Sequence, residues 1–275
     1  MNNIEEARDL IQKADDIFIL AGSGMSVELG TRTYWSGPDA KYAQKTSRFG
    51  YTDLEHATES LWQTDLSSQL MFYNETWRKM LETPVDTENS PYKMLLDYVT
   101  RENKNYVAMT TNIDSAFVRT GFKKSKVYEV HGSYRKSQCL KEPVEHGIFD
   151  TPNPYDNYAL CPTCGYYARP NVLFFDDLTF NPALTMAQLD DYSDFRLDSV
   201  RSKSVAIEVG AGETIPTIRN QSLILNKRFD TPVIRINPFK AKGVDGIAGI
   251  MGRSKTEPFI EIEANAIETL SSLLA

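Results

Sequence analysis

The chain has 275 residues, of which 41% are hydrophobic and 24% charged, and a formal net charge of −7. This length suits one large domain with a sizeable buried core. The acidic balance argues against nucleic acid or an anionic membrane as the main partner, since either would favour a basic face. The first residues, MNNIEEARDLIQKADD, lack the basic start and apolar stretch of a signal peptide, and no apolar run approaches a membrane span. Three cysteines suggest no disulfide framework, so we expect a reducing, cytoplasmic setting.

The first predicted elements are a helix and a buried strand. Apolar residues within 4–14 recur at helical spacing, and Ile17–Leu20 is short and apolar. Three later segments share this strand-like character: Tyr106–Met109, Val205–Val209 and Val233–Ile236. Helix-like segments separate them. Alternating strands and helices predict a parallel sheet with helices on both faces.

The first strand runs into a turn with almost no side chains, Gly22, Ser23 and Gly24. Backbone amides at such a turn can approach a phosphate closely, which side chains would prevent. The spacing to the next glycine, Gly30, does not match the dinucleotide-binding fingerprint. Two interpretations therefore remain open: a tight strand-to-helix turn without function, and a turn that faces an anionic ligand.

Two regions depart from simple alternation. Residues 36–90 carry apolar residues at helical spacing without a strand signal, and residues 133–170 are turn-rich and contain all three cysteines. We predict a single α/β domain over 1–275, with an inserted helical module at 36–90 and a small, irregular, cysteine-containing (zinc-ribbon-like) module at 133–170. The Rossmann-like sheet would then comprise residues 1–35, 91–132 and 171–275.

Polar residues follow the second strand. Asn112 and Asp114 lie in TTNIDSAF (110–117), and His131 follows the strand-like VYEV (127–130). Ligands bind at the carboxyl ends of parallel strands, and a histidine there suits a general base. An Asx-type helix cap would also explain the first two residues, and a core or surface histidine the third.

Two further polar segments follow predicted strands. Gly210, Ala211 and Gly212 come after the strand at 205–209, and Asn237 comes after the one at 233–236. Parallel strands bring their carboxyl ends to one edge of a sheet. A coincidence of helix caps is a poor explanation for polar turns after so many strands. The pattern therefore favours a ligand site at this edge.

The cysteine-containing module has partial zinc-site spacing. Cys161 and Cys164 form a C-x2-C pair, as in a zinc knuckle, and Cys139 lies upstream. Glu142 stands where the partner of Cys139 is expected, so the four-cysteine pattern is broken. We predict a structural zinc with Glu142 or His146 as the fourth ligand; the alternative is a module without metal.

Taken in order, these segments resemble the sirtuins, NAD-dependent protein deacylases and ADP-ribosyltransferases. GSGMS (22–26), TNID (111–114) and HGS (131–133) are similar to the family's phosphate-binding, ribose-binding and catalytic motifs. RPNVLFF (169–175) is similar to its substrate-binding stretch, and GAGE (210–213) and IN (236–237) stand where the family has Gly-Thr-Ser and Ile-Asn. The resemblance covers about residues 17–240.

The resemblance implies an NAD cofactor and specific residue roles. His131 and Asn112 would be catalytic, with His131 as the base, and Val172 and Phe174 would bind an acylated or otherwise modified protein substrate. The remaining cofactor contacts implied by the family are Ala21, Gly22, Ser23, Gly24, Met25, Tyr34, Asn112, Asp114, Gly210, Ala211, Gly212 and Asn237.

Several positions depart from the family pattern. The flexible loop reads GTRTYW (30–35), with Tyr34 and Trp35 in place of the family's phenylalanine and arginine, and Thr111 replaces a glutamine. Similar changes occur in a microbial branch linked to protein mono-ADP-ribosylation, but that branch lacks the histidine retained here as His131. We therefore expect an NAD-dependent protein-lysine deacylase. The alternatives are a mono-ADP-ribosyltransferase or NAD hydrolase, a non-catalytic NAD sensor, and a protein-binding scaffold.

Overall fold

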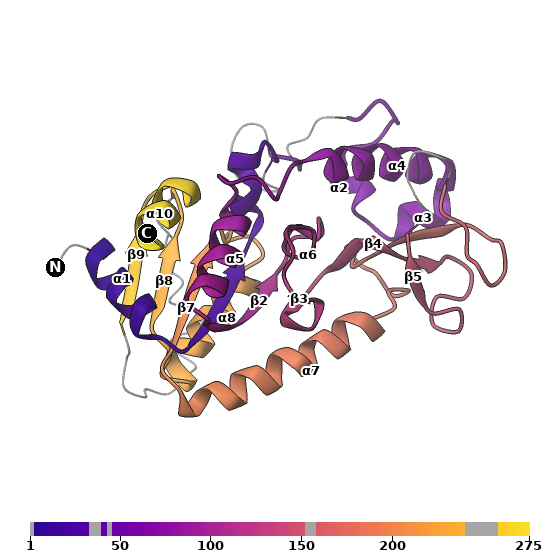
Figure 1. The fold of residues 1–275 in the computed structure, drawn as a ribbon. Coiled ribbons are helices and arrows are strands. Elements are labelled where there is room, and N and C mark those ends of the chain that lie inside the picture. The colour runs from indigo at the N-terminus through magenta and orange to yellow at the C-terminus, as the bar shows by residue number, and fades with distance from the viewer. Residues whose placement is uncertain (1–2, 33–39, 43–45, 152–157, 240–257) are drawn as a thin grey trace.

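The fold is built around a six-stranded parallel sheet (Figure 1). The computed structural model describes residues 3–32, 40–42, 46–151, 158–239 and 258–275. The strand order is β3-β2-β1-β7-β8-β9, so the first strand lies in the interior of the sheet. The strands are β1 (Asp16–Ala21), β2 (Asn105–Thr110), β3 (Val127–Glu129), β7 (Ser204–Val209), β8 (Val233–Ile236) and β9 (Phe259–Ile262).

Side-chain alternation along the strands creates two cores. Ile17 and Ile19 of β1 pack into one apolar cluster, while Phe18 and Leu20 pack into another on the opposite face. The first cluster is covered by α1 (Asn3–Lys13), α5 (Pro91–Arg101) and α10 (Ala266–Leu273). The second is covered by α7 (Ala183–Asp198) and α8 (Thr217–Arg228) (Figure 1). The predicted parallel sheet with helices on both faces is confirmed.

The four strands and the first helix predicted from the sequence are present within a residue or so of their expected bounds. Of the six strands of this sheet, only β9, at its end, was not predicted. It is preceded by residues outside the described ranges and followed closely by α10, and its alternation of apolar and acidic residues, FIEI, gives a weak signal.

A smaller lobe lies beside the carboxyl edge of the sheet (Figure 1). Its helices are α2 (Asp53–His56), α3 (Ser60–Thr64) and α4 (Leu66–Glu82), and its strands are β4 (Gly132–Cys139), β5 (Ile148–Asp150) and β6 (Ala168–Val172). The helices and strands share one core, in which Trp62, Tyr73 and Phe174 pack together.

The expectation of an irregular segment at 133–170 is wrong in one respect. β5, β4 and β6 form an antiparallel sheet in that order, with an irregularity between Ser133 and Ser137. The polar sequence of β4, GSYRKSQC, gives no strand signal. Its buried serine and glutamine side chains make hydrogen bonds, whereas a strand signal depends on buried apolar side chains.

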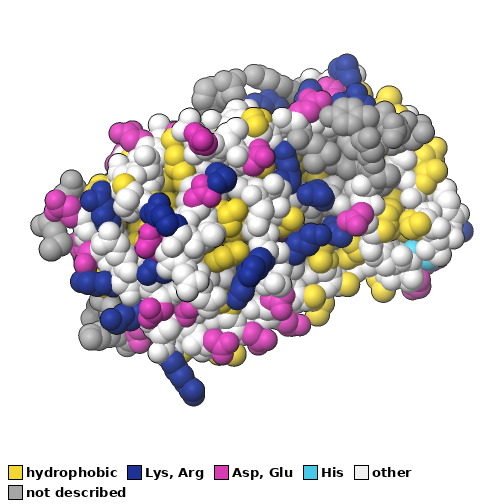
Figure 2. All heavy atoms as spheres, in the orientation of Figure 1, with side chains coloured by type: hydrophobic (Ala, Val, Ile, Leu, Met, Phe, Trp, Pro, Cys, Tyr) yellow, Lys and Arg dark blue, Asp and Glu magenta, His cyan; other side chains and the backbone are white. Residues whose placement is uncertain are grey.

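Acidic and basic side chains are interspersed on the face shown in Figure 2, without a single basic patch. Among the described helices, none has the length and hydropathy needed to cross a bilayer.

Candidate active site

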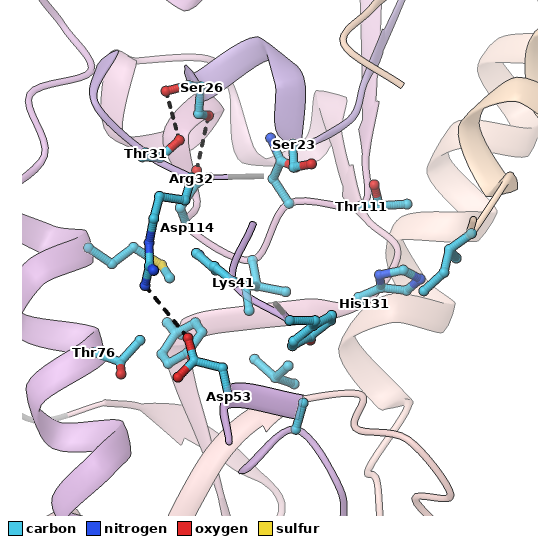
Figure 3. Close-up of a pocket in the computed structure, with 18 of the residues that line it drawn as sticks. Ser23, Ser26, Thr31, Arg32, Lys41, Asp53, Thr76, Thr111, Asp114 and His131 are labelled. Atoms are coloured by element: carbon cyan, nitrogen blue, oxygen red, sulfur yellow. Dashed lines mark hydrogen bonds and ion pairs between the residues drawn. The ribbon is translucent and has the colours of Figure 1, made fainter. Parts of the chain in front are cut away.

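The carboxyl ends of β1, β2, β3 and β7 border a cavity of about 830 Å³, which the small lobe lines from the other side. This volume lies within the range of small-molecule and cofactor sites. Figure 3 shows Ser23, Thr111 and His131 on one side of this space and Arg32 and Asp53 on another. Of the residues predicted from the sequence, those that line the cavity are Gly22, Ser23, Asn112, Asp114, His131, Val172, Phe174, Ala211 and Gly212.

The glycine turns after β1 and β7 are packed backbone against backbone. A Cβ atom on Gly22 would lie 2.6 Å from the carbonyl oxygen of Gly210, and one on Gly210 would lie 2.2 Å from the Met25 nitrogen. Gly24 donates its N–H to the Gly210 carbonyl at 3.0 Å. The bare turn is therefore required by packing, whatever it binds. Gly212 differs, because a Cβ there would meet no atom of the described residues within 4 Å, and it lines the cavity.

A buried hydrogen-bond chain orients Asn112. Its Nδ2 donates to the Gly22 carbonyl and to the Tyr92 hydroxyl, both at 3.1 Å. A carbonyl can only accept, so the amide nitrogen is fixed on this side and Oδ1 is the atom left for other partners. The Tyr92 hydroxyl contacts the Ser26 hydroxyl at 2.6 Å, and Ser26 donates to Asp114 at 3.3 Å. This series of hydrogen bonds thus links the first glycine turn to Asn112 and Asp114.

Asp114 lies among groups of opposite charge. Burial raises the pKa of its carboxyl, while the Ala116 N–H and the Lys41 ammonium act in the opposite direction. Burial in turn lowers the pKa of Lys41, opposed by the charge of Asp114. Across the cavity, Arg32 forms an ion pair with Asp53 at 3.6 Å (Figure 3).

His131 stands at the junction of the large sheet and the small lobe. Its carbonyl accepts the Leu173 N–H at 3.0 Å, so β6 ends beside it. Burial lowers the pKa of the imidazole below the usual 6.5, and a hydrogen bond to the backbone of Thr111 opposes this only in part. The ring is therefore neutral near pH 7 and able to accept a proton.

The residues predicted to bind substrate lie in a wall of the cavity between His131 and the helical part of the lobe. Val172 and Phe174 are buried, whereas Leu173 between them is 43% exposed and also lines the cavity. The Phe175 N–H donates to the Ala57 carbonyl at 2.9 Å, which fixes this segment to α2.

Five predicted cofactor residues within the described part of the chain do not line the cavity with the others: Ala21, Gly24, Met25, Gly210 and Asn237. Gly24 packs against the Gly210 backbone. Ala21 and Met25 are fully buried in the core beneath the turn. Gly210 is covered by the first turn, and Asn237 donates its Nδ2 to the Ala211 carbonyl at 2.9 Å, which places it behind the second turn. Tyr34 lies outside the described residues, as do its neighbours Thr33 and Trp35.

The three cysteines converge with His146. The ligand atoms of Cys139, His146, Cys161 and Cys164 all lie within 4.8 Å of one another. The Cys139 and Cys164 sulfurs are 3.7 Å apart, and the Cys161 sulfur is 3.5 Å from His146 Nδ1. A zinc tetrahedron with bonds of about 2.0–2.3 Å has edges of about 3.5–3.8 Å, so this donor set fits the ion.

Glu142 is exposed, and its backbone contacts the cysteine cluster. Its N–H points to the Cys139 sulfur at 3.5 Å, as does the Lys141 N–H at 3.3 Å. Of the two fourth ligands left open by the sequence, the geometry favours His146.

Sequence reasoning missed several residues around the cavity. Ser26 stands inside the GSGMS motif, so its position was available but its link to Asp114 was not. Arg32 lies in the loop segment GTRTYW, but no motif singles it out, and Tyr92, Lys41 and Asp53 belong to no recognisable pattern. They are brought to the site only by tertiary packing.

Taken together, these features define a Rossmann-like α/β protein with a ligand cavity between its sheet and a cysteine-containing lobe. The sequence profile of the Sir2 family matches residues 22–194. That match covers more than half of the chain, and the chain belongs to the Sir2 family.

Named relatives agree with this assignment. An NAD-dependent protein deacylase of Thermus thermophilus is 25% identical over 178 residues, 65% of each chain. The match thus spans just under two thirds of that relative. An NAD-dependent protein deacetylase of Listeria innocua is 26% identical over 236 residues, covering 83% of this chain and 86% of the relative. The crystal structure of a Sir2 homolog–NAD complex has a TM-score of 0.71 at 20% identity, covering 98% of this chain and 92% of that one.

Proposed function

We propose that the protein is an NAD-dependent protein-lysine deacylase. The observation that carries this proposal is the meeting of the glycine turns, Asn112, Asp114 and His131 in one cavity beside the substrate-side wall. Relatives named as NAD-dependent deacylases or deacetylases support the same activity.

The cavity fits NAD on its own geometry. Gly212 leaves space that a side chain would fill, and Gly22 and Ala211 bring further backbone to the same wall. We infer that these turns hold the diphosphate, because backbone amides can approach phosphate oxygens closely there. Asn112 and Asp114 would hold the nicotinamide riboside end. When bound, NAD supplies an anomeric carbon whose bond to nicotinamide can be broken.

The chain's own residues would then direct the reaction. Neutral His131 accepts a proton from a ribose hydroxyl through its free ring nitrogen, while its hydrogen bond to the Thr111 backbone keeps the ring oriented. The small lobe excludes water, which favours attack by the acyl oxygen over hydrolysis. Val172 and Leu173 present the end of an edge strand in the described part of the small sheet, suited to an extended peptide carrying the acyl-lysine.

Two finer assignments belong with this proposal. Zinc, held by the three cysteines and His146, would be structural, since four protein ligands leave no open position for chemistry. A cytoplasmic setting would keep these cysteines reduced and able to bind metal.

Nicotinamide release from NAD tests the activity. We expect release by the purified protein to require a pool of acyl-lysine peptides and to fall at least about 100-fold in His131→Ala. A thermal shift with NAD provides the folding and binding control for the variant.

Other outcomes would identify another function. Release without peptide, with label moving onto protein, would replace deacylation with ADP-ribosyl transfer. Release without labelled protein would identify an NAD hydrolase. A thermal shift with NAD but no release would leave a sensor, and the absence of both would leave a scaffold.

A further inference from the structure

A serine, a histidine and a glutamine form a hydrogen-bonded row in the small lobe, in a part of the cavity wall that the deacylase proposal does not use. The Ser47 hydroxyl lies 3.1 Å from His56 Nε2, and His56 Nδ1 lies 2.7 Å from Gln69 Oε1. Ser47 is part-exposed and lines the cavity, whereas His56 and Gln69 are fully buried behind it. A nucleophile, a base and an orienting group in this order are the geometric signature of nucleophilic catalysis.

The hydrogen bonds fix which ring nitrogen of His56 carries the proton. Gln69 Nε2 donates to the His56 carbonyl at 3.0 Å, and a carbonyl only accepts, so Oε1 must be the atom that faces the ring. Nδ1 is therefore the donor to Gln69, and Nε2 is the acceptor that faces Ser47. This is the tautomer a general base requires.

The imidazole is held rigidly. Its ring stacks on Phe72 with centroids 3.7 Å apart, and the rings of Tyr51 and Phe49 contact it edge-on. Tyr73 donates to the His56 carbonyl at 2.8 Å. Such a cage preserves the alignment of Nε2 with the serine hydroxyl, as preorganised catalysis demands.

The electrostatic surroundings favour a neutral base. Burial lowers the pKa of His56, while its hydrogen bond to Gln69 and the carboxylates of Asp53, Glu55 and Asp65 act in the opposite direction. The Phe49 N–H donates to the Ser47 oxygen at 3.2 Å and so stabilises negative charge developing on it.

We propose that Ser47, His56 and Gln69 form a second active site, which hydrolyses small carboxylic esters through an acyl-serine. The aromatic rings of Phe49 and Phe72 line the same cavity and give the acyl group an apolar surface. This activity needs neither NAD nor His131, so it goes beyond the proposed deacylation and stands or falls separately from it.

The steps balance without any further reactant except water. The Ser47 oxygen bonds to the ester carbonyl carbon while its proton passes to His56 Nε2. The carbon–alkoxy bond then breaks and the alcohol leaves with that proton. Water attacks the acyl-serine and gives a proton to Nε2. The serine oxygen departs with it, which releases the carboxylic acid and restores Ser47.

Hydrolysis of p-nitrophenyl acetate by the full chain, without NAD, tests the proposal. We expect Ser47→Ala to lower the rate at least about tenfold, whereas Ser60→Ala, at an exposed serine of α3, should retain it. Equal rates for wild type and Ser47→Ala would overturn the proposal.

Covalent labelling provides a second measurement that needs no variant. A fluorophosphonate probe should label the native wild-type protein on the peptide that contains Ser47, as read by mass spectrometry. Labelling on another serine, or no labelling, would overturn the proposal even if Ser47→Ala fails to fold. Loss of nicotinamide release in a protein that still labels at Ser47 would disprove the deacylase function alone.

Discussion

At the scale of single residues, the glycines of the two turns have two different roles. Gly22, Gly24 and Gly210 are excluded from carrying a side chain by backbone contact, and Gly210 also has a φ of 63°. Gly212 has open space beside it. The first three glycines hold the turns together, and the last leaves room for a ligand.

Alanine substitutions should separate these roles. Gly210→Ala forces a Cβ to 2.2 Å from the Met25 nitrogen and a left-handed backbone, so we expect it to lower the free energy of unfolding by at least about 2 kcal/mol. Gly212→Ala should leave the thermal midpoint nearly unchanged and weaken the thermal shift with NAD. Similar midpoints for both variants would contradict this distinction.

Glu129 is a buried carboxyl close to the site. It accepts a hydrogen bond from Ser115 at 2.7 Å, and Ser115 in turn contacts Ser133. Burial raises the pKa of Glu129 from 4.5 to about 7, because the hydrogen bond from Ser115 compensates only in part for the lost hydration. The folded state therefore retains a proton that the unfolded state has released.

This shift predicts a pH-dependent stability. Protonated Glu129 contributes about 3 kcal/mol to the free energy of unfolding. This contribution is present in full below pH 4.5 and is lost as the pH rises through about 7. Glu129→Gln carries no such proton, so its stability relative to wild type should increase between pH 4.5 and pH 8. Denaturant unfolding at both pH values measures this difference, and a constant difference would refute it.

How far the sequence could predict the site depends on the kind of residue. Asn112, Asp114 and His131 follow apolar strands, and strand ends converge in a parallel sheet, so their meeting was predictable. Tyr92 and Ser47, by contrast, lie in polar stretches of the sequence that match no motif. Their roles depend on partners 66 and 9 residues away, which no local pattern encodes.

At the scale of elements, a buried ion pair holds the segment after β6. Arg169 and Asp177 have no exposed side-chain surface and contact each other at 2.8 Å. Asp177 also accepts the N–H groups of Phe174 and Thr179. The carboxylate thus folds this segment back on β6 and positions Phe174 in the cavity wall.

Neutralising this carboxylate should be costly. Asp177→Asn leaves the Arg169 charge buried without its counter-ion, and we expect a loss of about 3–5 kcal/mol in the free energy of unfolding. Asp176→Asn is the matched control, because Asp176 is exposed and asparagine tolerates its φ of 56°. Equal denaturation midpoints for the two variants would show that the pair contributes little.

The cysteine cluster permits a similar comparison. His146→Ala removes a ligand atom and should lower bound zinc well below one equivalent, whereas Glu142→Ala leaves all four donors in place. Metal analysis of the purified variants measures this, and removal of zinc by a chelator should lower the thermal midpoint of the wild type. Retention of a full equivalent by His146→Ala would exclude His146 as a ligand.

At the scale of the whole molecule, the sequence predicted the large sheet better than the small lobe. The sheet's interior strands are buried on both faces and read as continuous apolar runs, such as IFIL in β1. β4 is stabilised by buried polar pairs, such as Asn171 Nδ2 donating to Gln138 at 2.8 Å, and its composition resembles a loop. Periodicity detects apolar burial and is insensitive to polar burial.

The strand order also constrains the time the chain needs to fold. β1 pairs with β2 on one side and with β7 on the other, in register from Asp16 with Asn105 and with Ser204. During synthesis, one edge of β1, with its backbone N–H and C=O groups, stays unpaired until β7 emerges, about 10–40 s later at 5–20 residues per second. Pairing so distant in sequence also slows refolding from denaturant. The nascent chain therefore depends on shielding of this edge, and refolding yield should fall as protein concentration rises.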